Sequence, residues 1–250
     1  MAKQSFQRTA LLYDPHHPYG SKHEYHLALD YLKRLKPKVN QIILGGDFAD
    51  FYKISFWKDD PERMPFKKEV EIVKQELKDL RSQFYRIPII YLEGNHEQRL
   101  YRYVRDKAPE LLYRNNVTDV LDLKARNIQY YSNIAAMCAG NLPLRLGKLF
   151  VLHGHEKKVS MNAINLARLF YNKCRVNVIA GHHHKTDFAL HKKLDGSHEG
   201  SWTVGTLGKL TEDYQPINEW NHGLAFVDVF DNNDFEVHNK IILNGRIING

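Results

Sequence analysis

The sequence predicts an α/β fold in which two packed mixed β-sheets are flanked by helices. The first half of the 250-residue chain alternates short apolar runs with helical periodicity, and the second half is rich in strand patterns. No linker, repeat or low-complexity segment separates the two halves. We therefore expect residues 1–250 to form a single domain.

The first half has the pattern of parallel strands joined by helices. Apolar runs predict strands at 9–13, 41–44 and 87–92, and a helix is expected at about 23–36. The clearest helix pattern covers 66–84. Charged residues fill its outer face, and apolar residues recur at steps of four and three: Phe66, Val70, Val73, Leu77, Leu80 and Phe84. We expect this stripe to pack into the core rather than to bind a ligand.

The second half contains most of the predicted strands. They are expected at 149–152, 176–180, 187–191, 201–204, 224–230 and 235–242. One helix, at about 161–172, interrupts them. Hairpin turns are expected at 195–196 and 231–234. Two sheets packed face to face with helices outside would accommodate both halves.

The composition is typical of a soluble globular protein. Its 43% hydrophobic content allows a sizeable core, and no stretch approaches the roughly 18 consecutive apolar residues of a membrane span. The N-terminal residues lack the apolar run of a secretory signal, so we expect a cytoplasmic protein without a membrane partner. Cys138 and Cys174 have no C-x-x-C spacing, so a metal would be held by His, Asp and Asn. The formal charge of +7 favours polyanionic partners without indicating which.

Polar clusters follow several of the predicted strands. They are D-P-H at 14–16, G-G-D-F-A-D at 45–50, G-N-H-E at 94–97, L-H-G-H at 152–155 and G-H-H-H at 181–184. The carboxyl ends of strands in an open α/β sheet lie along one edge, so clusters distant in sequence converge there. A carboxylate can bridge two cations, and Asp47 is the natural bridge because Gly45 and Gly46 let its backbone turn tightly off the strand. Two such cations can lower the pKa of a water and take up charge on a phosphoryl oxygen.

The order D-x-H, G-D-x-x-D, G-N-H-E, H-G and G-H-x-H resembles the motif series of the calcineurin-like metallophosphoesterases, over residues 14–184. The resemblance implies a double-sheet sandwich flanked by helices, phosphoester hydrolysis and two divalent metal ions, with manganese foremost and iron, zinc or nickel open. It implies one metal held by Asp14, His16, Asp47 and His184, and a second held by Asp47, Asn95, His153 and His182.

The same resemblance implies roles for three residues that do not bind metal. His96 would donate to the leaving group or the phosphoryl group, and Asp50 would orient its imidazole. Arg99 would contact a non-bridging phosphoryl oxygen. Phe51-Tyr52 follows Asp50 where the protein-phosphatase branch has Arg-Gly, so one phosphate-binding arginine of that branch is missing. The chain also resembles phage and prophage members, for which the location would be the host cytoplasm.

Several residues near these motifs have two interpretations. His17, His155 and His183 could contact substrate or be structural, and the structural role is favoured. An aromatic group could form one wall of the substrate cleft, but we favour a loop held by its own core: Phe48, Phe51, Tyr52, Phe56 and Trp57. A basic and aromatic group suits either a polyanion track or a solvated helix face: Tyr101, Arg102, Tyr103, Arg105 and Lys107.

Three functions are compatible with these observations. Hydrolysis of a phosphodiester in DNA, RNA or a nucleotide is favoured by the basic charge, the missing arginine and the phage likeness. Phosphomonoester hydrolysis is the alternative, favoured by Arg99. A scaffold without catalytic activity is disfavoured, because it would not need His96 and Asp50 beside a complete set of ligands.

Overall fold

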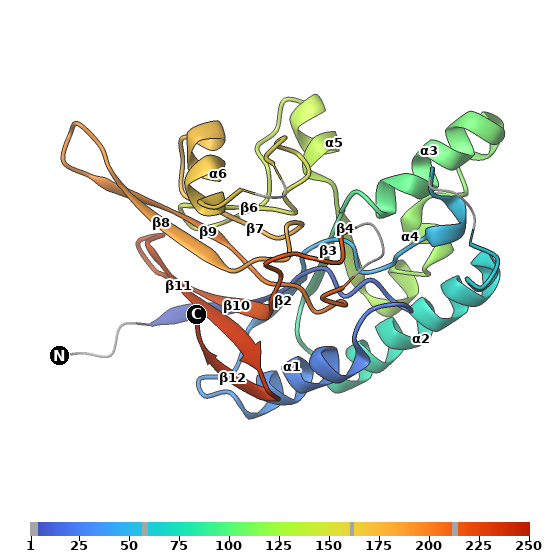
Figure 1. Ribbon diagram of the computed structural model, residues 1–250, viewed down its shortest axis with the longest axis horizontal. Helices are drawn as coiled ribbons and strands as arrows, with labels where there is room; N and C mark the ends of the chain where they lie inside the picture. The colour runs from blue at the N-terminus through green and yellow to red at the C-terminus, as the bar shows by residue number, and fades with distance from the viewer. Residues whose placement is uncertain (1–4, 57–59, 161–162, 212–214) are drawn as a thin grey trace.

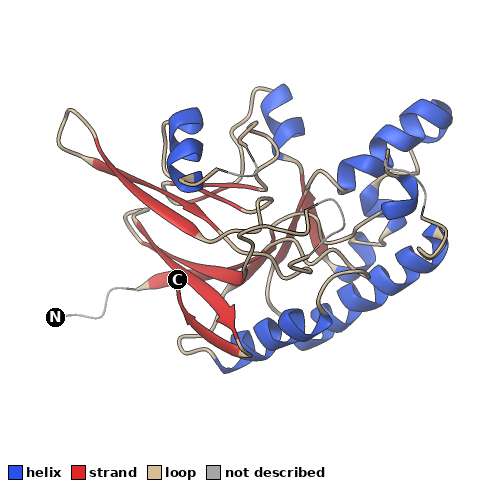
Figure 2. Cartoon of the chain, in the orientation of Figure 1, coloured by secondary structure: helices blue, strands red, loops and turns tan. Residues whose placement is uncertain are grey.

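Two β-sheets pack face to face, and helices cover their outer sides (Figure 1; Figure 2). The structure is a computed structural model and describes residues 5–56, 60–160, 163–211 and 215–250. This architecture confirms the fold class that the sequence predicts. No helix among the described residues is long and apolar enough to cross a membrane.

The larger sheet combines parallel strands from the first half with antiparallel strands from the end of the chain. Its order is β12 (Arg246–Asn249), β11 (Phe235–Leu243), β10 (His222–Phe230), β1 (Phe6–Leu12), β2 (Gln41–Leu44), β3 (Ile89–Leu92) and β4 (Ile128–Tyr131). The four strands β1 to β4 are parallel to one another, whereas β10 is antiparallel to both of its neighbours, β1 and β11. The carboxyl ends of β1, β2 and β3 therefore share one edge.

The smaller sheet has its parallel strands in the centre. Its order is β5 (Arg145–Leu146), β6 (Leu149–Leu152), β7 (Val178–Ala180), β9 (His198–Thr203) and β8 (Asp187–Lys192). Strands β6, β7 and β9 are mutually parallel, and β8 pairs antiparallel to β9 as a hairpin.

Helices form the outer layers. They are α1 (Lys22–Arg34), α2 (Phe66–Gln83), α3 (Glu97–Lys107), α4 (Val117–Val120), α5 (Asn133–Cys138) and α6 (Leu166–Cys174), with 3₁₀ turns η1 (Tyr52–Ile54), η2 (Pro109–Leu111) and η3 (Lys124–Arg126). Helices α1 and α2 run along the larger sheet, and α6 lies on the smaller one (Figure 1).

The side chains of β1 show how the layers are held. Ala10 and Leu12 point into the core beneath α1 and α2, whereas Leu11 and Tyr13 point into the core between the two sheets. All four side chains are fully buried. A strand buried on both faces explains why the sequence shows a continuous apolar run here instead of alternation.

Helix α2 follows its predicted bounds closely and shows one difference. Val73, Leu77 and Leu80 are fully buried, as the apolar stripe predicts. Glu69, however, does not lie on the solvent face expected for the charged residues: it is also fully buried, and its carboxylate accepts a hydrogen bond from the Phe51 backbone N–H. Burial raises the pKa of Glu69 to about 8.

Other boundaries differ from the sequence prediction. The helix expected at about 161–172 begins only at Leu166, after Asn165, and its first two predicted residues lie outside the described part of the chain. The sequence patterns do not predict strands β4, β5 (Arg145–Leu146) and β12 or helices α4 and α5, and they indicate α3 only as a possible solvated helix face. In β4 only Ile128 is buried, because this strand lies at the edge of its sheet, so no apolar pattern marks it in the sequence.

We predict that Leu77→Ala lowers the free energy of unfolding by about 2–5 kcal/mol, because the side chain is fully buried between α2 and the larger sheet. Urea denaturation measures the change. Lys78→Ala, at the exposed neighbouring position, is the matched control and should stay within about 0.5 kcal/mol of the parent. Equal losses in the two variants would contradict the assignment of the stripe to the core.

Candidate metal centre

The structure brings together the seven residues that the sequence motifs single out as metal ligands. Each lies in a loop at the carboxyl end of a strand, in the order β1, β2, β3, β6 and β7: Asp14 and His16, Asp47, Asn95, His153, His182 and His184. Because β1, β2 and β3 belong to one sheet and β6 and β7 to the other, the site lies where the two sheets present the same ends.

Within the site, side-chain nitrogen and oxygen atoms face one another in compact groups. Asp14, His16 and His184 offer ligand atoms within 4.8 Å of one another, and so do Asp47, His153 and His182. The two groups adjoin, because His153 Nδ1 lies 3.6 Å from Asp14 Oδ1.

The individual distances are those of atoms that converge on a common point. His16 Nε2 lies 3.3 Å from His184 Nε2. His153 Nε2 lies 3.0 Å from Asn95 Oδ1 and 3.4 Å from Asp47 Oδ2. Asn95 therefore joins the second group through its amide oxygen.

The backbone at the site is in an unusual conformation. Five of the seven residues have positive φ angles, at 54°, 49°, 49°, 67° and 58°: Asp14, His16, Asp47, His182 and His184. Such left-handed residues cost roughly 1–3 kcal/mol each and persist only where their surroundings hold them. The strain is concentrated at the residues that must aim a side chain inward from a strand end.

Glu97 holds the loops that follow β2 and β3. Its Oε2 accepts hydrogen bonds from the backbone N–H groups of Asp47 (2.9 Å) and Gly94 (2.8 Å). Its Oε1 accepts from the Ala49 backbone N–H (3.2 Å) and the Tyr91 hydroxyl (2.7 Å). The residue is fully buried, and burial together with the charge of Asp47 raises its pKa to about 7.

Sequence reasoning named Glu97 only as the last letter of G-N-H-E and missed this role. The available signal was an acidic side chain between a buried strand and the first turn of a helix, where it can meet backbone N–H groups. Gly94 adds a steric requirement. A Cβ at this position would lie 2.2 Å from Asp47 Oδ1 and 2.4 Å from Asp47 N, so only glycine lets the two loops approach.

A second support orients His153. Its Nδ1 lies 2.9 Å from the Gly45 carbonyl oxygen and donates to it, which leaves the Nε2 lone pair directed at Asp47 and Asn95. Glu156 accepts from the His153 backbone N–H (3.1 Å). Thr206, from the loop after β9, donates its hydroxyl to the Asp14 carbonyl oxygen (2.7 Å). The sequence patterns gave no indication of Glu156 or Thr206.

Opposing charges dominate the electrostatics of the site. Burial alone would raise the pKa of Asp47, but the facing imidazoles of His153 and His96 outweigh it and hold that pKa well below its ordinary value. Burial raises the pKa of Asp14 to about 6, against the influence of His153. Burial would lower the pKa of His153, yet the charges of Asp47 and Asp14 raise it to about 10. The site is therefore built to hold positive charge next to its carboxylates.

The donor set fits divalent cations. Asp14 Oδ1 is buried and has no hydrogen-bond partner among the described residues. A buried polar atom without a partner is costly, and a cation held beside Asp14 would satisfy it. Carboxylate, amide and imidazole donors suit manganese, iron, zinc or nickel.

Asp50 lies beside this site and is shared among three cationic or polar groups. Its Oδ2 lies 3.5 Å from His96 Nδ1 and 3.4 Å from His16 Nδ1. Arg99 Nη1 donates to the Asp50 carbonyl oxygen (2.9 Å) and to Oδ1 (3.3 Å), and Arg99 Nη2 lies 2.7 Å from His96 Nε2. The structure thus joins all three residues, but Asp50 faces His16 as well as His96.

The neighbouring histidines separate into two kinds. His17 is buried between the rings of Tyr25 and Phe48, at centroid distances of 4.6 and 4.8 Å, in a structural position. His183 is buried against Phe170. His155 and His183 also adjoin the centre, because their rings lie 5.2 Å from that of His153 and 4.9 Å from that of His182, respectively.

The aromatic group after Asp47 agrees with the interpretation of a loop held by its own core. Phe48 and Phe51 are fully buried beneath α1 and α2. Phe56 is 79% exposed, and Tyr52 lies under the guanidinium of Arg63, whose carbon is 4.7 Å from the ring centroid. Trp57 lies outside the described residues.

Comparison with known proteins identifies one family. A family model described as calcineurin-like phosphoesterase matches residues 10–195, which include all seven candidate ligands and the group around Asp50. No curated protein matches the chain.

We predict that Glu97→Gln lowers the free energy of unfolding of the metal-free protein by about 1–3 kcal/mol. An amide nitrogen in place of one carboxylate oxygen would face backbone N–H donors that it cannot satisfy. Denaturation monitored by circular dichroism measures the effect, and Glu71→Gln on the exposed face of α2 is the control. If both variants unfolded like the parent, Glu97 would not be holding the two loops.

Proposed function

The chain belongs to the calcineurin-like phosphoesterase family, a family of metal-dependent hydrolases, and we propose that it cleaves phosphodiester bonds in nucleic acid or nucleotides. The observation that carries the proposal is the convergence of two adjoining groups of ligand atoms on one edge of the two sheets. This arrangement suits a reaction that needs two cations close together, as phosphoryl transfer does.

Asp47 is the shared ligand in our assignment. One cation would be held by Asp14, His16, Asp47 and His184, and the other by Asp47, Asn95, His153 and His182. The cations would supply Lewis-acid polarisation of the phosphoryl oxygens and a water of lowered pKa. Manganese is our first candidate for both positions.

Three residues beside the metal ligands would serve the reaction without binding metal: His96, Asp50 and Arg99. His96 Nε2 lies 3.7 Å from Asp47 Oδ2, so its imidazole borders the centre. Its ligand atom lies within 4.8 Å of those of His16 and Asp50, in a third group that our assignment reserves for substrate rather than metal. Asp50, facing Nδ1, would hold the ring in orientation. Arg99 reaches both residues, and a phosphoryl oxygen of the substrate would compete with His96 Nε2 for its Nη2.

The surroundings of the site favour a polyanionic substrate. Helix α3 leads away from His96 and carries Arg102, Arg105 and Lys107. Tyr101 and Tyr103, which are 53% and 45% exposed, lie among them, as expected of a surface that follows a nucleic-acid strand. The formal charge of +7 also favours binding of a polyanion. We also propose that the protein acts in the cytoplasm, which would be the host cytoplasm if a phage encodes it.

We predict that the purified protein, loaded with manganese, turns over bis-p-nitrophenyl phosphate faster than p-nitrophenyl phosphate. A diesterase need not bind the second negative charge of a monoester, and this chain has Phe51 where protein phosphatases have an arginine. The ratio of kcat/KM for the two compounds distinguishes a phosphodiesterase from a phosphomonoesterase. A clear preference for the monoester would favour a phosphomonoesterase, for which Arg99 is the supporting residue.

We predict that His96→Asn leaves metal content and folding nearly unchanged while lowering kcat by roughly 10²- to 10⁴-fold, as expected for a positioned acid. The deficit should be largest for substrates with poor leaving groups, because an activated nitrophenolate leaves without protonation. Asp50→Asn should give a weaker version of the same pattern. Loss of bound metal in His96→Asn would show that a ligand has been misassigned.

A further inference from the structure

Strand β8 has an unusually apolar edge. It is the last strand of the smaller sheet, and no described strand pairs with its outer side. Phe188 and Leu190 nevertheless leave 53% and 57% of their surface exposed. Proteins usually protect such edges with charged residues or proline, because an exposed apolar edge strand readily pairs with another chain. In β8 the charged residues, Asp187 and Lys192, lie at the two ends of the strand, and the segment 188–190 between them carries no charge.

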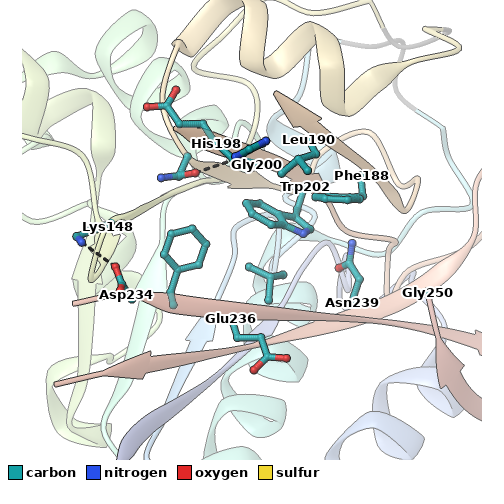
Figure 3. Close-up of a pocket in the computed structure, with 14 residues that line it drawn as sticks. Lys148, Phe188, Leu190, His198, Gly200, Trp202, Asp234, Glu236, Asn239 and Gly250 are labelled. Carbon is teal, nitrogen blue, oxygen red and sulfur yellow. Dashed lines mark hydrogen bonds and ion pairs between the residues drawn. The ribbon is translucent and has the colours of Figure 1, made fainter. Parts of the chain in front are cut away.

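A cleft lies directly beside this edge. It has a volume of about 650 Å³ and opens between the β8–β9 hairpin and β11 (Figure 3). Phe188 and Trp202 line one wall with ring centroids 5.3 Å apart, and Phe235 contacts Trp202 from the other side at 5.7 Å. The Trp202 indole lies flat across Gly200, where a Cβ would be 2.1 Å from the ring. The apolar surface therefore continues from the strand edge into the cleft.

The backbone of β8 offers its outer hydrogen-bonding groups at even-numbered residues. In the hairpin turn the Lys193 N–H donates to the Ser197 carbonyl oxygen (2.9 Å), so odd-numbered residues face β9. The backbone N–H and C=O groups of Phe188, Leu190 and Lys192 consequently point away from β9. The Phe188 N–H donates locally to the Oδ1 of Asp187 (2.8 Å), so pairing with another strand would exchange this acceptor for a backbone carbonyl.

We propose that β8 pairs antiparallel with β8 of a second copy of this chain about a two-fold axis at Ala189. Phe188 then lies opposite Leu190 of the partner subunit, and each pair exchanges the outward-facing backbone hydrogen bonds. Both side chains lie on the cleft face of the sheet, so the two apolar surfaces become continuous (Figure 3). The smaller sheets of the two copies join into one.

The strand is complementary to itself in this register. Ala189 meets its own copy at the axis, where opposing Cβ atoms come within roughly 4.5–5.5 Å and a small residue fits. Asp187 lies opposite His191 of the partner subunit, and like charges meet only beyond the strand, where Lys193 lies opposite Lys185 of the partner subunit. Self-complementarity is the property required of a two-fold interface, which is why we choose a second copy over an unrelated peptide. The net charge of +7 on each copy opposes association, so added salt should strengthen it.

Sedimentation equilibrium from about 1 to 100 µM tests the proposal. The parent chain should form dimers, and Leu190→Lys should weaken them by at least about tenfold, because it places a charge on the apolar edge of each copy. Ile248→Lys is the matched control. It changes a 43% exposed isoleucine on β12, the edge strand of the larger sheet, and should dimerise like the parent.

Leu190→Pro provides a second test that does not add charge. It removes an outward-facing N–H while leaving the β8–β9 ladder intact, so it should also give monomers with an unchanged circular dichroism spectrum. A monomeric parent at the highest concentration would overturn the proposal. Dimers that survive both changes at Leu190, or that Ile248→Lys dissociates equally, would also overturn it.

Discussion

The carboxylate of Glu97 lies in the interior and accepts four hydrogen bonds, three of them from backbone N–H groups of two different loops. It thereby fixes the distance between the loop that carries Asp47 and the loop that carries Asn95. Neither loop has regular secondary structure to hold it, and both must bring a side chain to the same point. A buried charge that satisfies several orphan donors is a rigid way to do this.

The strained backbone of the site depends on the same kind of support. Asp47 has a φ of 49°, and its N–H is held by Glu97 while its Oδ1 accepts from the His96 backbone N–H (2.8 Å). Asp14 is held from two sides, by the His182 backbone N–H at Oδ2 and by Thr206 at its carbonyl oxygen. Asp14, Asp47 and His153 are therefore oriented by protein contacts, and a cation would find these donors already in place.

The sequence was sufficient to predict which residues meet at the ends of the strands, because each proposed ligand follows a strand in an order that resembles a known family. Apolar periodicity also located α2 and most strands. Neither signal could find Glu97 or Glu69, since their carboxylates are buried against backbone N–H groups of other segments. Glu156 was missed as well, although the backbone N–H groups that it accepts from, those of His153 and Gly154, belong to its own loop. The sharing of Asp50 between His16 and His96 likewise depends on the relative position of two loops, which no local pattern encodes.

We propose that two cations share Asp47 at the junction of the two sheets. The most direct measurement is manganese stoichiometry in the parent and in Asp47→Ala, determined by equilibrium dialysis with elemental analysis. We expect two ions per parent chain. The variant should lose binding at both metal positions, because the Asp47 carboxylate is the only ligand that both positions share. One ion per parent chain, or equal metal content in parent and variant, would contradict it.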